Sequence, residues 1–290
     1  MSTPPHLSLP DRARAYLLTT ERGPFAVHDI APDPAVRPSG AAVLVPGFTG
    51  SKEDFITILE PLSMRGWRVV ALDQRGQYES PGADDVAAYD LAELGQDLLA
   101  VIAAMDAGPV HVVGHSFGGL SARAAAIEDP TAFLTLTLLC SGPGPIGGAE
   151  AERARQLEAA LQQYDLPDIW VVIGSLAEAN GEYDGVPPAI RAFLRRRFLS
   201  NAAAGMLAMV RQLLDTPDRT DELAKTGVPL LVAYGKDDYV WLPAEQSATA
   251  ARLGARDEVI RGAGHSPAVQ EPLATASLLE GFWRASASPE

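Results

Sequence analysis

The chain has 290 residues, of which 47% are hydrophobic, and this length and composition suit one large globular unit with a sizeable core. Its 23 Lys and Arg residues against 37 Asp and Glu residues give a formal net charge of −14. Binding to nucleic acid or to an anionic membrane surface therefore has no electrostatic support. The single cysteine, Cys140, excludes an internal disulfide and a cysteine-rich metal site, and we expect a buried structural thiol.

The start of the chain has no basic segment followed by an apolar stretch, so the sequence does not predict a signal peptide. No apolar run approaches the roughly 20 residues that a membrane-spanning helix needs. We therefore expect no membrane insertion and a cytoplasmic location.

Strand patterns and helical patterns alternate over the first half of the chain. A proline-rich arm, residues 1–10, comes first, and we expect it to be loose. Strand-like runs follow at 14–20 and 24–30, which predict a hairpin, and at 41–45, 67–72, 110–113 and 132–140. Helical periodicity lies between them, over 51–66, 86–106 and 120–130. This alternation predicts a mostly parallel central sheet flanked by helices, an α/β fold.

The alternation stops after residue 140. A Gly- and Pro-rich linker at 141–148 leads into residues 149–225, where every pattern is helical. The alternation then resumes with a strand pattern at 228–234, a helix to residue 253, a strand-like run at 256–260 and a final helix over 268–283. We therefore predict a core formed by residues 1–143 and 226–290, interrupted by an inserted helical cap at 144–225.

The segment Gly114-His115-Ser116-Phe117-Gly118 lies between an apolar β-branched run and a helical run of small residues. Strand, Gly-x-Ser-x-Gly and helix in that order predict a nucleophile elbow, a turn so tight that the serine hydroxyl is pushed out above the sheet edge. Glycine is needed on both sides of the turn because a Cβ there would meet the neighbouring strand or helix. Ser116 is therefore the candidate nucleophile.

Taken with these strands, the turn resembles that of the α/β-hydrolase superfamily, and the resemblance covers nearly the whole chain. Four further motifs follow the order of that family: Pro46-Gly47-Phe48 (oxyanion loop), Asp73-Gln74-Arg75-Gly76, Gly235-Lys236-Asp237-Asp238 (acid turn) and Gly262-Ala263-Gly264-His265 (histidine loop). The resemblance implies a triad of Ser116, Asp238 and His265, in the family's chain order. It selects Asp238 by its place three residues after the glycine, and Asp237 stays open as the alternative.

The chemistry requires these residue types. A serine hydroxyl is a poor nucleophile at neutral pH, so a base must remove its proton, and a histidine with an orienting carboxylate suits that role. The resemblance implies an oxyanion hole made by the backbone N–H groups of Phe48 and Phe117. Two departures from the family are visible: Pro46 replaces a common histidine, and Gly76-Gln77-Tyr78-Glu79-Ser80 lacks the usual Gly-His-Gly-x-Ser. Whether Tyr78 or Glu79 reaches the pocket is open; a solvated loop is favoured.

The resemblance favours a carboxylesterase-like serine hydrolase that acts on an ester or related acyl bond of a small to medium apolar molecule. C–C bond hydrolysis and a cofactor-free perhydrolase use the same triad, and a slow or non-catalytic ligand-binding protein is a further alternative. Epoxide hydrolases and haloalkane dehalogenases are disfavoured because their nucleophile is an aspartate. We expect no cofactor and no metal, because no ligand cluster such as His-Glu-x-x-His occurs. The sequence does not predict the oligomeric state.

Predictions for the substrate-binding residues are weaker. Val240 and Trp241 follow the acid turn, and Trp170 is one of several large apolar residues in the cap, so these three are candidate substrate contacts. His115 is assigned to packing and is expected to face away from His265. The run 195–197, three arginines, favours a solvated helix face over an anion site.

Overall fold

The computed structural model describes residues 1–287, and their strands form one eight-stranded sheet. The strand order is β1-β2-β4-β3-β5-β6-β7-β8. The pairs β1–β2 and β2–β4 are antiparallel, and every pair from β4 onward in this order is parallel. The strands are β1 (Ala13–Thr20), β2 (Gly23–Ile30), β3 (Gly40–Val45), β4 (Trp67–Leu72), β5 (Val110–His115), β6 (Phe133–Leu139), β7 (Leu230–Gly235) and β8 (Arg256–Ile260). The predicted α/β fold is confirmed.

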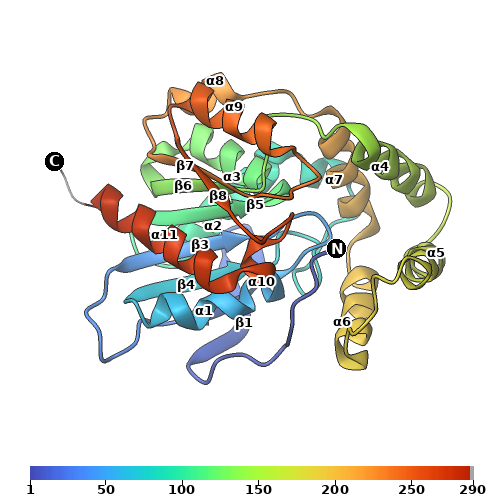
Figure 1. The fold of residues 1–290 in the computed structure, drawn as a ribbon, viewed down its shortest axis with the longest axis horizontal. Helices are drawn as coiled ribbons and strands as arrows, with labels where there is room; N and C mark the ends of the chain where they lie inside the picture. The colour runs from blue at the N-terminus through green and yellow to red at the C-terminus, as the bar shows by residue number, and fades with distance from the viewer. Residues whose placement is uncertain (288–290) are drawn as a thin grey trace.

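Helices cover both faces of the sheet (Figure 1). Helices α1 (Ile56–Ser63), α10 (Pro267–Gln270) and α11 (Pro272–Ala287) lie on one face, and α2 (Leu91–Ala104), α3 (Phe117–Glu128) and α9 (Pro243–Leu253) pack on the other. Three short 3-10 helices, η1 (Lys52–Phe55), η2 (Val86–Tyr89) and η3 (Pro130–Ala132), join these elements. In residues 1–287, none of the helices combines the length and apolarity that crossing a bilayer would require.

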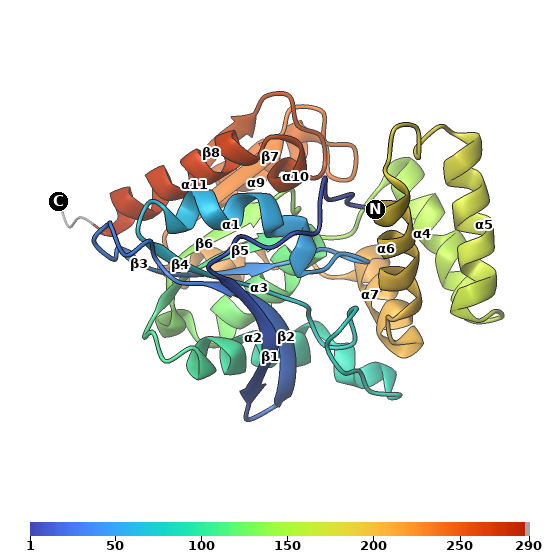
Figure 2. The same cartoon turned by 90° about the horizontal axis from the view of Figure 1, so that it is seen from below.

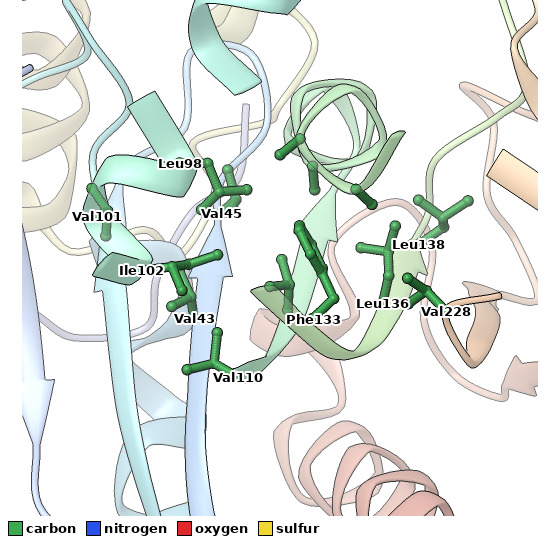
Figure 3. Packing of buried hydrophobic residues seen from close by; sticks show 14 of the residues in the cluster. Val43, Val45, Leu98, Val101, Ile102, Val110, Phe133, Leu136, Leu138 and Val228 are labelled. Carbon is green, nitrogen blue, oxygen red and sulfur yellow. The ribbon is translucent and has the colours of Figure 1, made fainter. Parts of the chain in front are cut away.

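Valine, isoleucine and leucine side chains fill the space between the sheet and its helices. Figure 3 shows Val43 and Val45 of β3 packed against Leu98, Val101 and Ile102 of α2. The inner parallel strands, β3 to β7, are buried on both faces, which explains their mainly apolar runs. The edge strand β8 is largely exposed and carries charged residues. This packing holds the carboxyl ends of β3, β5 and β7 in fixed relative positions, and those ends carry the candidate site.

Two predicted helices are interrupted in the structure. The run 86–106 is divided at Asp90, whose ψ of 148° is extended and starts α2 afresh. The final run 268–283 is divided at Glu271, because Pro272 has no backbone N–H and begins α11 at its first position. In both cases a residue that favours the start of a new helix divides a run whose apolar residues recur at helical spacing.

The N-terminal arm is not loose. Pro4 is buried, Leu9 packs against the core cluster under α1 and α11, and Leu7 packs against the apolar cluster of α5 and α6. Figure 2 shows the N-terminus beside α6. The arm therefore bridges the sheet layer and the helical insertion, which no local pattern in residues 1–10 could indicate.

Five helices follow β6 before β7 within the described residues: α4 (Gly148–Leu161), α5 (Leu166–Ala179), α6 (Pro188–Leu199), α7 (Ala203–Asp215) and α8 (Thr220–Ala224). Helices α4–α7 lie together at one end of the sheet (Figure 2). Helix α8 instead packs against α3 and α9 of the core. We call α4–α7 the cap.

A buried arginine fastens the cap to the core. Arg197 of α6 has no exposed side-chain surface, and its Nη1 donates to Asp54 Oδ1 at 2.7 Å. Its Nη2 donates to the backbone oxygen of Ser2 at 2.7 Å. The prediction of a solvated face holds for Arg195 and Arg196, which are exposed, but is wrong for Arg197. The buried residues of α6, Ile190, Phe193, Leu194, Arg197 and Phe198, recur at three- and four-residue spacing, so Arg197 lies on the apolar stripe.

We expect Arg197→Met to lower the free energy of unfolding by roughly 3–5 kcal/mol, because it leaves the Asp54 carboxylate buried without its partner. Arg196→Met is the matched control, since Arg196 is exposed, and it should change stability by less than about 1 kcal/mol. Urea denaturation of both variants measures the difference. Equal losses would contradict a specific role for the buried pair.

Burial lowers the pKa of His111 to about 4, so this residue is neutral in the folded protein. An unfolded histidine has a pKa of about 6.5, so between that pKa and the lower pKa of the folded state the unfolded chain binds a proton that the folded protein does not. The free energy of unfolding therefore falls as the pH falls through this range. For His111 this amounts to roughly 2 kcal/mol at pH 5. Between pH 7 and pH 5, wild type should therefore lose roughly that much more stability than His111→Phe. Denaturation curves at both pH values test this, and equal losses would show the assigned pKa to be wrong.

Candidate active site

Ser116 occupies the turn between β5 and α3 with a strained backbone. Its φ of 53° and ψ of −122° place it in the left-handed half of conformational space, which residues with a Cβ rarely adopt. The flanking glycines are sterically required. A Cβ on Gly114 would lie 2.5 Å from the backbone oxygen of Gly118, and one on Gly118 would lie 2.4 Å from that of Val45. The structure thus has the predicted strand–turn–helix geometry at Ser116.

The structure brings the three predicted triad residues together from three separate loops. Ser116 Oγ lies 3.0 Å from His265 Nε2, and His265 Nδ1 lies 2.9 Å from Asp238 Oδ1. A carboxylate only accepts hydrogen bonds, so Nδ1 carries the proton and Nε2 is free to accept from the serine hydroxyl. This is the protonation pattern that a general base toward Ser116 needs.

Asp238 is held as a carboxylate. Its Oδ1 also accepts from the Val240 N–H at 3.0 Å, and its Oδ2 accepts from Gln246 Nε2 at 2.8 Å. Burial alone would raise the pKa of Asp238, but the hydrogen bonds from His265, Val240 and Gln246 hold it below the usual value. Asp237, the alternative acid, is exposed at the surface, whereas Asp238 is buried against the histidine.

His115 contacts the catalytic loop, contrary to the expectation that it faces away from His265. Its Nε2 lies 2.6 Å from the backbone oxygen of His265, and the two rings are 5.2 Å apart. A carbonyl oxygen only accepts, so Nε2 carries the proton, and burial lowers the pKa of His115 to about 4, which keeps the ring neutral. The side chain of His115 therefore binds the main chain of the histidine loop.

The predicted oxyanion loop lies directly against Ser116. A Cβ on Gly47 would lie 2.9 Å from Ser116 Cβ and 3.3 Å from its Oγ, so a larger residue does not fit there. Phe117 is the first residue of α3, and its N–H therefore has no partner within the helix. Within residues 1–287, the Phe48 N–H donates to no protein acceptor. In the described part of the chain, neither predicted donor therefore has a hydrogen-bond acceptor.

A cavity of about 230 Å³ opens over Ser116 and His265. Its apolar wall is formed by one residue of the oxyanion loop, three from the cap and its linker, and one after the acid turn: Phe48, Ile146, Leu157, Leu213 and Val240. Arg153 and Glu150 of α4 also line it and form an ion pair with each other. Asp54, Thr49 and Ser266 line it as well, so the apolar wall faces polar groups, as in sites that orient small organic molecules.

The three candidate substrate contacts occupy different places. Val240 lines the cavity. Trp241 is buried beside it, with Nε1 donating to the backbone oxygen of Gly144 at 3.2 Å, and is not among the lining residues. Trp170 packs inside the cap against Phe198, with ring centroids 5.3 Å apart, and does not line the cavity either.

Tyr78 and Glu79, whose positions the sequence left open, are not among the residues that line the cavity. Glu79 accepts from Lys52 Nζ at 2.7 Å, and Lys52 also donates to the buried Asp73 at 2.8 Å. Although burial would lower the pKa of Lys52, these carboxylates raise it, so the amine stays charged. Tyr78 packs edge-on against Phe193 of the cap at 5.6 Å. The segment after β4 therefore contacts both Lys52, which follows the oxyanion loop, and Phe193 of the cap.

Cys140, Asp238 and His265 place potential metal-ligand atoms within 4.8 Å of one another. The donor set does not suit a metal. Burial raises the pKa of the Cys140 thiol well above its usual value, so the thiolate that a metal would need is disfavoured. The imidazole and the carboxylate already bind each other directly.

We expect Asp238→Asn to lower kcat by about 10³- to 10⁴-fold, because an amide neither fixes the histidine tautomer nor stabilises its protonated form. Asp237→Asn is the neighbouring control, and it should retain at least half of the wild-type kcat, because Asp237 is exposed. Steady-state kinetics on one ester distinguish them. A larger loss in Asp237→Asn than in Asp238→Asn would reverse the assignment of the acid.

The chain is similar in sequence to known hydrolases. The chain is 29% identical over 245 residues to the rhodomycin D methylesterase of Streptomyces peucetius, covering 75% of this chain and 82% of that one. It is 28% identical over 200 residues to the 2-hydroxy-6-oxononadienedioate/2-hydroxy-6-oxononatrienedioate hydrolase of Paraburkholderia xenovorans, covering 67% of each. A relative from Variovorax paradoxus is 34% identical over 125 residues, which span only 45% of its length.

Among solved structures, a thermophilic esterase from Thermogutta terrifontis superposes with a TM-score of 0.73 at 24% identity, covering 95% of this chain and 100% of that one. At this identity the likeness shows the fold. The model of one family, described as the alpha/beta hydrolase family, matches residues 42–278, which contain the elbow, the acid turn and the histidine loop. The chain belongs to the alpha/beta hydrolase family.

Proposed function

We propose that the protein is a serine hydrolase that cleaves an ester or related acyl bond of a small to medium, mainly apolar molecule. The observation that carries the proposal is the unbroken chain of contacts from Ser116 Oγ through His265 to the Asp238 carboxylate, at 3.0 and 2.9 Å. Each group has the protonation state and the partner that nucleophilic acyl transfer requires.

In the first step His265 Nε2 takes the proton of Ser116 Oγ as the oxygen attacks the substrate carbonyl. The tetrahedral oxyanion is then bound by the N–H groups of Phe48 and Phe117, and one such donor contributes roughly 3 kcal/mol to lowering the barrier. His265 returns the proton to the departing alcohol oxygen, leaving an acyl-serine. Water, deprotonated by the same imidazole, attacks this acyl group and releases the acid and the free serine.

The cavity supports a small substrate. Its volume of about 230 Å³ lies below the range of roughly 300–1,000 Å³ that is common for drug-sized ligands. It would hold roughly seven or eight water-sized groups, since a water's share of liquid volume is about 30 Å³. The apolar wall favours a short alkyl or aryl acid over a charged one.

The comparisons supply two substrate chemistries. The methylesterase relative acts, by its name, on a methyl ester, and its alignment covers 75% of this chain. The second relative acts, by its name, on a dicarboxylate with a keto group and no ester, so its hydrolysis breaks a C–C bond. A dianion needs cationic partners, and the guanidinium that lines this cavity, Arg153, is already paired with Glu150. Ester hydrolysis is therefore the function that we propose, with C–C hydrolysis as the second candidate.

We expect wild type to hydrolyse p-nitrophenyl esters, with an optimum at short acyl chains that fit the cavity. Ser116→Ala should lower kcat by at least about 10⁴-fold, as removal of a triad nucleophile does. Ser175→Ala, on the exposed face of α5, is the control and should match wild type. Turnover of a keto-dienoate but of no ester would favour C–C hydrolysis, and turnover only with hydrogen peroxide present would favour a perhydrolase. Equal inertness of wild type and Ser116→Ala toward all of them would favour a ligand-binding protein.

A further inference from the structure

Two buried glutamines in the turn after β4 donate to the oxyanion loop, and the sequence patterns assign no role to either side chain. Gln77 Nε2 donates to the backbone oxygen of Gly47 at 2.9 Å, and Gln74 Nε2 donates to that of Pro46 at 2.9 Å. Gln77 is 1% exposed and Gln74 is 4% exposed. We propose that Gln77 is the positioning residue of the oxyanion hole and that it aims the Phe48 N–H at the reacting carbonyl oxygen. This inference rests on the proposed serine-hydrolase function.

The argument follows from peptide geometry. The carbonyl of Gly47 and the N–H of Phe48 belong to one planar peptide unit, and in a trans peptide they point in opposite directions. No cis peptide occurs in residues 1–287. A donor that holds the Gly47 carbonyl on the side of the β4 turn therefore turns the Phe48 N–H to the opposite side. Because Gly47 lies against Ser116, that side carries the nucleophile.

The orientation of the Gln77 side chain is itself determined by a neighbour. Its Oε1 accepts from the Gln74 backbone N–H at 3.1 Å, so the amide can present only its NH₂ group to Gly47. Gly50 N–H donates to the same carbonyl at 3.0 Å, and the two donors together use both lone pairs. Loss of Gln77 removes one of the two restraints on this peptide plane.

Gln74 provides an internal comparison because its environment is nearly the same. Its Oε1 accepts from Ser121 Oγ of α3 at 2.7 Å, and its NH₂ group holds the carbonyl of Pro46. That carbonyl shares its peptide plane with the N–H of Gly47, which is not one of the two proposed donors. Both glutamines bind a carbonyl of the same loop, but only Gln77 controls the plane that contains a catalytic N–H.

The test compares Gln77→Met with Gln74→Met. Methionine is unbranched and of similar length, and each substitution removes one donor and one acceptor from a buried position. Thermal denaturation should show similar losses of stability. With a short-chain p-nitrophenyl ester, Gln77→Met should lower kcat by about 10- to 100-fold with KM changed less than about threefold, somewhat less than removal of a whole oxyanion donor. Gln74→Met should lower kcat by less than about fivefold.

Losses of kcat that are equal in the two variants, or a loss that appears in KM instead, would overturn the inference and leave the proposed function intact. Wild-type turnover that depends on Ser116 decides the proposed function separately. A crystal structure of Gln77→Met provides a readout that needs no turnover. A rotated Gly47–Phe48 peptide plane supports the positioning role, and an unchanged plane overturns it.

Discussion

The strained turn at Ser116 is the constraint on which the rest of the site depends. A residue with a Cβ is held at a φ of 53° because β5, α3 and the oxyanion loop approach so closely that only glycine fits around it. Holding such a conformation requires rigid surroundings, and the apolar layers on both faces of the sheet provide them. The same close approach brings Gly47 against Ser116. Within residues 1–287, the N–H groups of Phe48 and Phe117 donate to no protein acceptor.

Around this turn, buried side chains hold each proposed catalytic group through its main chain or through its second side-chain atom. His115 holds the backbone of His265, Gln246 holds the second oxygen of Asp238, and the two glutamines hold the oxyanion loop. Breaking one of these buried contacts would leave a polar group without its partner, which costs about 1–3 kcal/mol. The arrangement therefore gives the site one stable geometry and makes its supporting residues sensitive to substitution.

The cap forms part of the cavity over this site. Helices α4 and α7 supply Leu157 and Leu213 of the apolar wall, while the buried pair of Arg197 and Asp54 ties α6 to the segment just after the oxyanion loop. The N-terminal arm joins at the same point through Ser2. Cap docking and oxyanion-loop geometry are thus connected through a few buried polar contacts.

The sequence predicts those features that depend on short segments. Local patterns predict the parallel strands, the elbow at Ser116, and the acid and histidine turns. The structure brings together the side chains of Ser116, Asp238 and His265 from these turns. Our prediction for Arg197 was wrong although the sequence contains a local signal of its burial, because residues 190, 193, 194, 197 and 198 form one buried stripe of the helix. The contact between His115 and His265, 150 residues apart, has no local signal, and neither has the docking of the N-terminal arm. The placement of Trp170 and Trp241 outside the cavity depends on how the cap packs, which single-sequence patterns do not determine.

Covalent labelling tests the central claim, an activated Ser116, without knowledge of the substrate. A small alkyl fluorophosphonate reacts with a serine oxygen only when a base removes its proton and an oxyanion hole binds the phosphoryl oxygen. Incubation followed by peptide mass spectrometry should find one adduct per chain, on the peptide that contains Ser116. Labelling should be slower by several orders of magnitude in His265→Ala. Labelling of another residue, or none in wild type, would contradict the account.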